Sequence, residues 1–242
     1  MSGPDLDLEK PTAVGVLDRL TTNVALSLIA VLPTLFFALA MPWRLGPLLR
    51  EDDPEGRQGM CLAPGAFFPL SLFVFLMAAA LISTPEAAER DGSFIGPGLA
   101  ISIQTAISDG NVWRAIAAVL PIYVFSVIVG TVSVGLAPLT KQNWTLRVSL
   151  RATFYVIATV LSCVIILTAM AEWSRDVTEA NDVAEFIYIV SPIFVFGPIF
   201  WMYLWFFRSG GDVAWWRSVL LSFAMLAIML GVIIVLGLLA GL

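Results

Sequence analysis

The side chains that could do chemistry in this chain are few, and most lie outside its apolar runs. The sequence contains no histidine and two cysteines, Cys61 and Cys163. Without histidine, bis-histidine haem sites, histidine-based zinc sites and Ser–His or Cys–His nucleophilic pairs are excluded. Cys61 lies at the mouth of one apolar run and Cys163 in the middle of another, so we expect no disulfide between them. We interpret both as small apolar side chains.

One cluster of carboxylates could bind a divalent cation, and it consists of Glu51, Asp52, Asp53 and Glu55. The cluster lacks the regular ligand spacing and the glycine of an EF-hand loop. Arg50 and Arg57 flank it, so a solvated surface turn is the better interpretation. We therefore predict no catalytic, metal-binding or cofactor-binding residue, and we do not expect an enzyme.

A basic set with one tryptophan is the candidate for contact with lipid headgroups. Its members are Lys141, Trp144, Arg147 and Arg151. Each basic side chain near an anionic membrane surface contributes roughly 1 kcal/mol of attraction. Ordinary anchoring of a membrane protein's topology explains the same pattern, so both interpretations stay open.

The elements that must position these residues are strongly apolar. Hydrophobic residues make up 59% of the 242 positions and charged residues 13%, and the mean hydropathy is +0.92. A soluble domain has about 45–50% apolar and about 25% charged residues. Both deviations indicate an integral membrane protein. The net charge of −5 argues against nucleic acid as a partner.

A helix needs about 20 mostly apolar residues to cross a bilayer. On this basis the sequence predicts an all-α, polytopic integral membrane helical bundle with five spans, at residues 64–82, 115–136, 152–171, 187–207 and 218–242. Pro192 and Pro198 in the fourth of these predict a bent or partly unwound helix. The connections 84–112 and 175–186 contain apolar residues at helical spacing, so we expect amphipathic helices on the membrane surface there.

The segment before the bundle is harder to assign. We expect residues 1–63 to form a cytoplasmic or interfacial segment and residues 64–242 to form the bundle. Within the first segment, the apolar run 24–41 contains Pro33 and could be a sixth span. If it does not cross, ten of the thirteen basic residues fall on one side of the membrane, and if it does, the division is eight to five.

The basic residues also predict the orientation of the chain. Because Lys and Arg accumulate in cytoplasmic loops, the sharper ten-to-three division favours five spans. It also predicts a cytoplasmic N-terminus and a C-terminus outside. In a bacterium this membrane would be the plasma (inner) membrane.

Small residues four positions apart predict where helices approach one another closely in lipid. Such pairs occur at Ser126 with Gly130 and at Ala158 with Ser162. The last span has two more, formed by Ala227, Gly231, Gly237 and Gly241. These residues either pack inside the bundle or form an assembly face toward another subunit, and the last span is the best candidate for such a face.

The order of these segments resembles the Yip-type (Rab-interacting) family of five-span membrane proteins and its bacterial relatives. The residues that carry the resemblance lie before and within the first predicted span: Pro42, Trp43, Pro47, Leu62-Ala63-Pro64 and Phe67-Phe68. The family's acidic cytoplasmic motif has no clear match here. The resemblance implies a non-enzymatic membrane component that organises membranes or helps to assemble partners.

Two functions are therefore open. The first is a non-catalytic scaffold, accessory subunit or membrane organiser whose partners are membrane lipids and other membrane subunits or further copies of the chain. The second is a small oligomeric transporter or channel for a neutral solute, with the helix around Pro192 and Pro198 lining its path.

Overall fold

The computed structural model describes residues 28–49, 61–82, 112–140, 144–178, 181–211 and 213–239. In these ranges all regular structure is helical, as the sequence predicts, and no strand occurs. Three helical segments of the described chain are long and apolar enough to cross a membrane, namely Leu120–Leu139, Leu146–Val164 and Trp215–Leu238. They overlap the second, third and fifth predicted spans.

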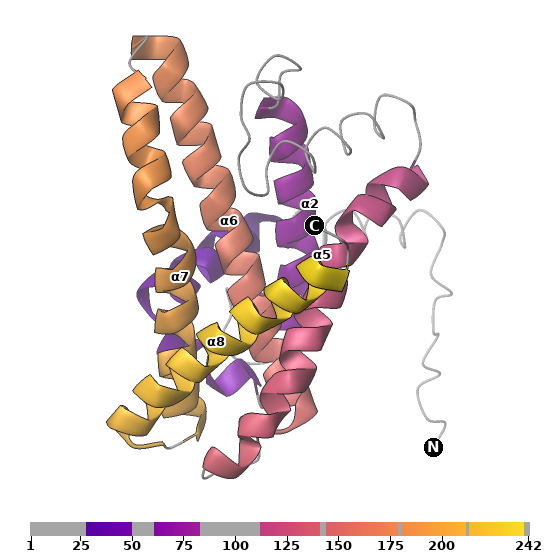
Figure 1. Ribbon diagram of the computed structural model, residues 1–242, viewed down its shortest axis with the longest axis vertical. Helices are drawn as coiled ribbons and strands as arrows, with labels where there is room; N and C mark the ends of the chain where they lie inside the picture. Colours follow the sequence, from indigo (N-terminus) through magenta and orange to yellow (C-terminus); the bar gives the residue numbers. More distant parts are fainter. Residues whose placement is uncertain are drawn as a thin grey trace, which may run out of the picture.

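The long helices run back and forth past one another (Figure 1). In chain order they are α2 (Pro64–Ile82), α5 (Val112–Val132), α6 (Leu146–Thr178), α7 (Asn181–Gly211) and α8 (Trp215–Leu239). The 3-10 helix η3 (Ser133–Leu139) extends α5. Helix α6 lies at the centre and packs against α2, α5 and α7, while α8 packs on α7 and crosses toward α5.

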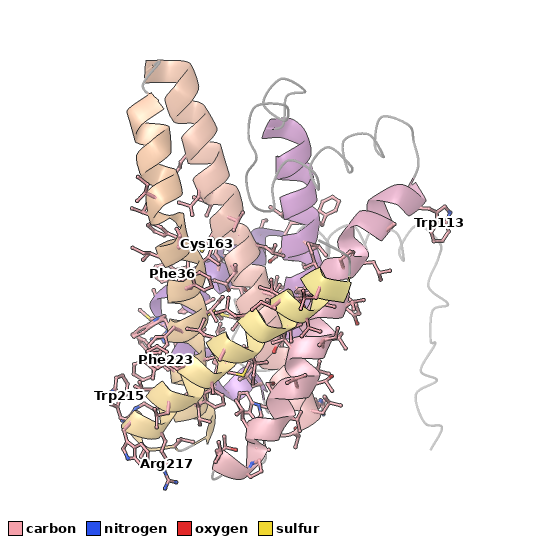
Figure 2. The ribbon with its side chains drawn as sticks, in the orientation of Figure 1. Phe36, Trp113, Cys163, Trp215, Arg217 and Phe223 are labelled. Atoms are coloured by element: carbon pink, nitrogen blue, oxygen red, sulfur yellow. The ribbon has the colours of Figure 1, made fainter. Side chains whose placement is uncertain are left out.

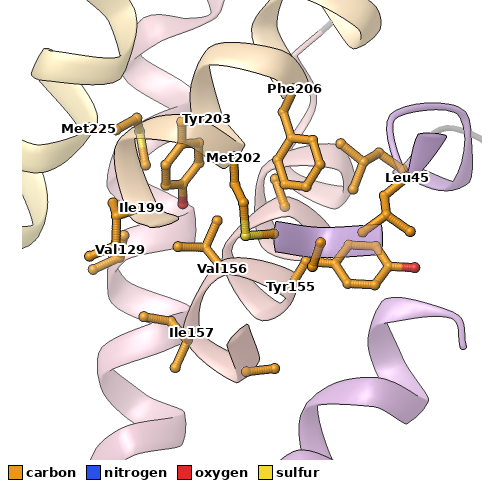
Figure 3. Close-up of a cluster of buried hydrophobic side chains, with 14 of the residues drawn as sticks. Leu45, Val129, Tyr155, Val156, Ile157, Ile199, Met202, Tyr203, Phe206 and Met225 are labelled. Atoms are coloured by element: carbon orange, nitrogen blue, oxygen red, sulfur yellow. The ribbon is translucent and has the colours of Figure 1, made fainter. Parts of the chain in front are cut away.

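The core lies between α6 and α7 (Figure 3). Tyr155 and Val156 of α6 meet Met202 and Phe206 of α7, and all of these side chains are fully buried. Leu45, from the segment before α2, reaches the same cluster. These side chains fill the contact between the inner faces of α6 and α7.

A glycine sets the contact between α5 and α6. A Cβ at Gly130 would lie 2.7 Å from Cδ2 and 3.2 Å from Cα of Leu150, so a larger residue would push the helices apart. The Ser149 hydroxyl lies 2.7 Å and the Ser133 hydroxyl 3.0 Å from the carbonyl oxygen of Gly130, and the two hydroxyls also contact each other, so their two protons serve two of these three contacts at a time. This pair of helices therefore meets as a small-residue contact of the kind the sequence predicts.

The observed helix bounds agree with the predicted spans in one case and exceed them in others. Helix α2 covers Pro64–Ile82, the same residues as the first predicted span. Helix α6 begins and ends beyond the third predicted span, because charged residues that end an apolar run are good helix formers. The expectation of a separate surface helix at 175–186 is wrong, since residues 175–178 form the end of α6 and residues 181–186 the start of α7. The other expected surface helix, at 84–112, lies outside the described residues, apart from its last position.

The prolines of α7 do not interrupt it. Pro192 and Pro198 both lie inside a helix that is continuous over Asn181–Gly211, so the alternative of a partly unwound helix is wrong, and the alternative of a bent helix stays a prediction. Transmembrane helices tolerate proline because neighbouring groups satisfy the freed backbone carbonyl.

The chain before α2 packs into the bundle. Its helix Leu28–Ala40 passes behind α6 and α7 at an angle to both (Figure 1). At about 1.5 Å per residue the described part of this helix is about 20 Å long, against about 30 Å for a bilayer core. Two short 3-10 helices follow, η1 (Pro42–Arg44) and η2 (Pro47–Leu49). Leu45, Leu48 and Leu49 around them are buried, so this part of the predicted N-terminal segment belongs to the core.

Candidate functional site

Arginines gather at one end of the bundle, where α6 and α8 begin, α7 ends and η1 and η2 pack. We call this the arginine end, and its members are Arg44, Arg147, Arg151, Arg208 and Arg217. Figure 2 shows Arg217 pointing away from the bundle at this end. Arg114 and Arg175 belong to the opposite ends of α5 and α6. The sequence placed the same five arginines on one side of a membrane.

The predicted lipid-binding set does not form one exposed patch. Arg147 is exposed, but Trp144 is only 3% exposed and its indole ring packs on Phe207 at 4.6 Å between ring centroids. Arg151 is part-buried, and its guanidinium donates to the carbonyl oxygens of Leu49 at 3.2 Å and Leu48 at 3.5 Å. Lys141 lies outside the described residues. The structure thus gives Trp144 and Arg151 packing contacts inside the fold.

The contact of Arg151 fixes the segment before α2 to α6. Carbonyls at the end of a short helix such as η2 have no partner within it, and a charged donor satisfies them well. On the other side of this segment, Trp201 Nε1 of α7 donates to the Leu39 carbonyl at 3.0 Å. Long-range hydrogen bonds therefore hold residues 39–49 between α6 and α7.

A second group of polar contacts joins the start of α2 to the same helices. The Tyr155 hydroxyl donates to the Leu62 carbonyl at 2.6 Å, and the Leu62 amide donates to Thr34 Oγ1 at 2.9 Å. Thr34 in turn donates to the Ala30 carbonyl at 2.7 Å. Cys61 stands beside this chain of bonds as a free, half-buried thiol. Burial raises the pKa of the Cys61 thiol, and the charge of Arg44 acts in the opposite direction but more weakly.

An indole cluster at the arginine end is the feature that sequence reasoning missed. The Trp205 ring contacts Trp43 at 4.9 Å, Trp201 at 5.6 Å and Trp215 at 6.2 Å between centroids. Four tryptophans from η1, α7 and the start of α8 are thus brought together. Their positions near span ends predict interface anchoring, but the sequence gives no spacing from which contact between distant segments could be predicted.

Three arginines lie over aromatic rings around this cluster. The guanidinium carbon lies 5.5 Å from the ring centroid for Arg208 over Trp215 and for Arg44 over Phe37, and 5.0 Å for Arg217 over Trp216. All three arginines are exposed. Such cation–π contacts hold a guanidinium in place while its N–H groups remain able to donate.

The predicted assembly face on α8 is open in the structure. Ala227 is exposed, and a Cβ at Gly231 or Gly237 would meet nothing within 4 Å. Gly241, the last of the predicted set, lies outside the described residues. By contrast, Ala158 and Ser162 of the other predicted pairs are buried in the bundle. The pairs on α5 and α6 thus pack inside the molecule, and the outer face of α8 has no partner among the residues that the structure describes.

Comparison of the chain with protein-family models, curated proteins and solved structures gives no match. Within the described ranges, no group of three or more His, Cys, Asp or Glu side chains lies together in a way that could hold a metal ion. The function is therefore inferred from the geometry of the bundle and of its arginine end.

Proposed function

We propose that this chain is a non-catalytic membrane protein that acts as a scaffold, accessory subunit or membrane organiser. The main support is the use of its buried polar groups. Tyr155, Trp201 and Arg151 all donate to backbone carbonyls of the chain itself. Four buried hydroxyls donate to the carbonyl one helical turn earlier, those of Ser126, Thr159, Ser162 and Ser222. These bonds stabilise shape. This function is also the one that the resemblance to Yip-type proteins implies.

We further propose five spans with a cytoplasmic N-terminus and an outer C-terminus. Helices α2, α5, α6, α7 and α8 alternate in direction along the chain (Figure 1), as successive crossings require. The arginine end would face the cytoplasm under the positive-inside rule. Tags placed after Asp5 and after Leu242 test this arrangement, because five spans require them on opposite faces. Tags on one face would contradict it.

The alternative, a transporter for a neutral solute, has less support. It would use α7 around its prolines as the lining of a path. Pro192 is exposed, and so are its neighbours Ile193, at 69%, and Phe194. This part of α7 therefore faces away from the described bundle, where lipid or another subunit would contact it.

Native mass measurement of the full chain, extracted from its membrane in mild detergent, tests the proposed function. We expect a species heavier than the 26.2 kDa chain, containing either a companion membrane protein or further copies. Gly231→Leu serves as the variant, since a Cβ at this position meets nothing within 4 Å in the described part of the chain. A protein that is always a monomer, and that carries a neutral solute across liposome membranes, would overturn the proposal in favour of transport.

A further inference from the structure

The exposed arginines at the indole cluster have no counter-charge in the described chain. Arg44, Arg208 and Arg217 each contact an aromatic ring, and among the residues that the structure describes no carboxylate pairs with them. Asp212, between α7 and α8 in the sequence, lies outside those residues. Helix α8 has no acidic residue in its first turn and carries Arg217 there. A cation at a helix N-terminus is unfavourable unless an anion lies nearby.

The backbone around these arginines is firmly positioned. A Cβ at Gly46 would overlap the side chain of Ser209, so the turn between η1 and η2 lies directly against the end of α7. Trp43 and Trp215 both contact Trp205. Each guanidinium lies over its own ring, Phe37, Trp215 or Trp216, before any ligand binds, and such preorganisation lowers the entropy lost on binding.

We propose that Arg44, Arg208 and Arg217 form a surface of the arginine end that binds the phosphate groups of anionic phospholipids. Tryptophan side chains lie at headgroup depth in membranes, so arginines stacked on and beside them lie where lipid phosphates lie. The planar guanidinium donates two parallel hydrogen bonds to phosphate. An apolar surface continues from the site along α8, with exposed Leu220 and Phe223, and acyl chains can lie against it. Figure 2 shows Trp215 and Phe223 on the left of α8, and Arg217 below the start of this helix.

This site differs from the set predicted from the sequence. Trp144 is buried and Arg151 holds backbone carbonyls, so neither belongs to it. The inference rests on the proposed function in one respect, the embedding of the bundle in a membrane with the arginine end at its surface.

Lipid retention by the full chain in detergent tests the proposal. Phosphatidylglycerol is titrated onto the protein and the bound lipid is counted by native mass spectrometry. Zwitterionic phosphatidylcholine, whose phosphate is balanced by the choline cation, is the comparison without net charge. We compare the wild type with R44Q/R208Q/R217Q. The matched control is R90Q/R114Q/R175Q, which removes the same charge from positions that the proposed topology places on the other side.

We expect the first triple variant to bind phosphatidylglycerol about tenfold more weakly or worse, and the control to stay within about twofold of the wild type. Thermal unfolding shows whether each variant is folded. If the triple variant does not fold, Arg217→Gln alone is used, and about a fivefold loss is expected. Equal losses in both triple variants, or no loss in the first, would overturn the proposal.

Two further measurements distinguish a lipid phosphate from free phosphate, and the lipid site from the scaffold function. Inorganic phosphate that displaces phosphatidylglycerol, or that binds as tightly, would overturn the assignment to a lipid. The same spectra report the mass of the protein assembly. A monomer that still selects phosphatidylglycerol contradicts only the scaffold function, and an oligomer without selectivity contradicts only the lipid site.

Discussion

At the scale of single residues, the buried polar side chains tie segments together that are distant in the sequence. Tyr155 is the clearest case, because its hydroxyl donates to Leu62 across the start of α2. Tyr155→Phe removes this bond and leaves a carbonyl without a donor. We expect the free energy of unfolding to fall by about 1–2 kcal/mol, measured by thermal or denaturant unfolding in detergent.

The matched control is Tyr123→Phe. Tyr123 is half exposed, and the described chain gives its hydroxyl no hydrogen bond. Its loss should change stability by less than about 0.5 kcal/mol. Similar effects of the two substitutions would mean that the Tyr155 hydroxyl contributes nothing beyond its ring.

Cys61 gives a second prediction at this scale. Burial holds the pKa of its thiol above the ordinary value, and Arg44 lowers that pKa in part. The thiolate is the reactive form, so alkylation in a Cys163→Ala background should be slow at neutral pH and accelerate only in the alkaline range. Arg44→Gln should raise the pKa further and shift the rate profile to higher pH. A rate that is already maximal at neutral pH would contradict the assignment.

The sequence predicts where these residues lie better than it predicts what they contact. Counting basic residues places Arg147 and Arg151 at one membrane face, and the structure brings both to the arginine end. The count of basic residues does not reveal that Arg151 turns inward to η2, because that contact joins residues about a hundred positions apart. For the same reason the indole cluster around Trp205 could not be predicted.

At the scale of helices, the bounds of an apolar run and the bounds of the helix that contains it need not coincide. Pro64 is tolerated in the first turn of a helix, so the run and the helix begin together in α2. In α6 they separate, because the helix continues through Arg147 at one end and Glu172 at the other. Hydropathy reports which residues suit lipid, whereas the backbone hydrogen bonds of a helix continue into water.

A pair of small residues in the sequence does not reveal whether it packs inside the bundle or faces outward. This leads to a prediction for Gly130. Its Cβ position collides with Leu150 of α6, so Gly130→Leu should separate α5 from α6. We expect a loss of about 3 kcal/mol or more, since overpacking alone costs 1–3 and the Gly130 carbonyl also loses its serine donors. Thermal unfolding measures it.

Gly231→Leu is the control for Gly130→Leu because α8 has open space there. It should leave the unfolding temperature of the single chain nearly unchanged. If Gly231→Leu were as destabilising as Gly130→Leu, the outer face of α8 would have to be packed within the chain.

At the scale of the whole molecule, large apolar side chains are exposed on several sides. They occur on the helix before α2, on α5, on α7 and on α8, with examples at Leu32, Leu120, Ile193 and Leu238. A soluble monomer rarely exposes contiguous apolar patches beyond a few hundred Å². We expect the protein to remain in the membrane pellet after alkaline carbonate extraction, and its release into the supernatant would contradict an integral membrane protein.

The hydrogen bonds from α6 and α7 to residues 39–49 have a consequence for biogenesis. The partners of Leu49 and Leu39 are Arg151 and Trp201, which are synthesised 102 and 162 residues later. During translation the early helix therefore lacks its final contacts until α7 has been synthesised. A nascent chain truncated before α7 should leave this helix accessible to protease, and completion of α7 should bury it.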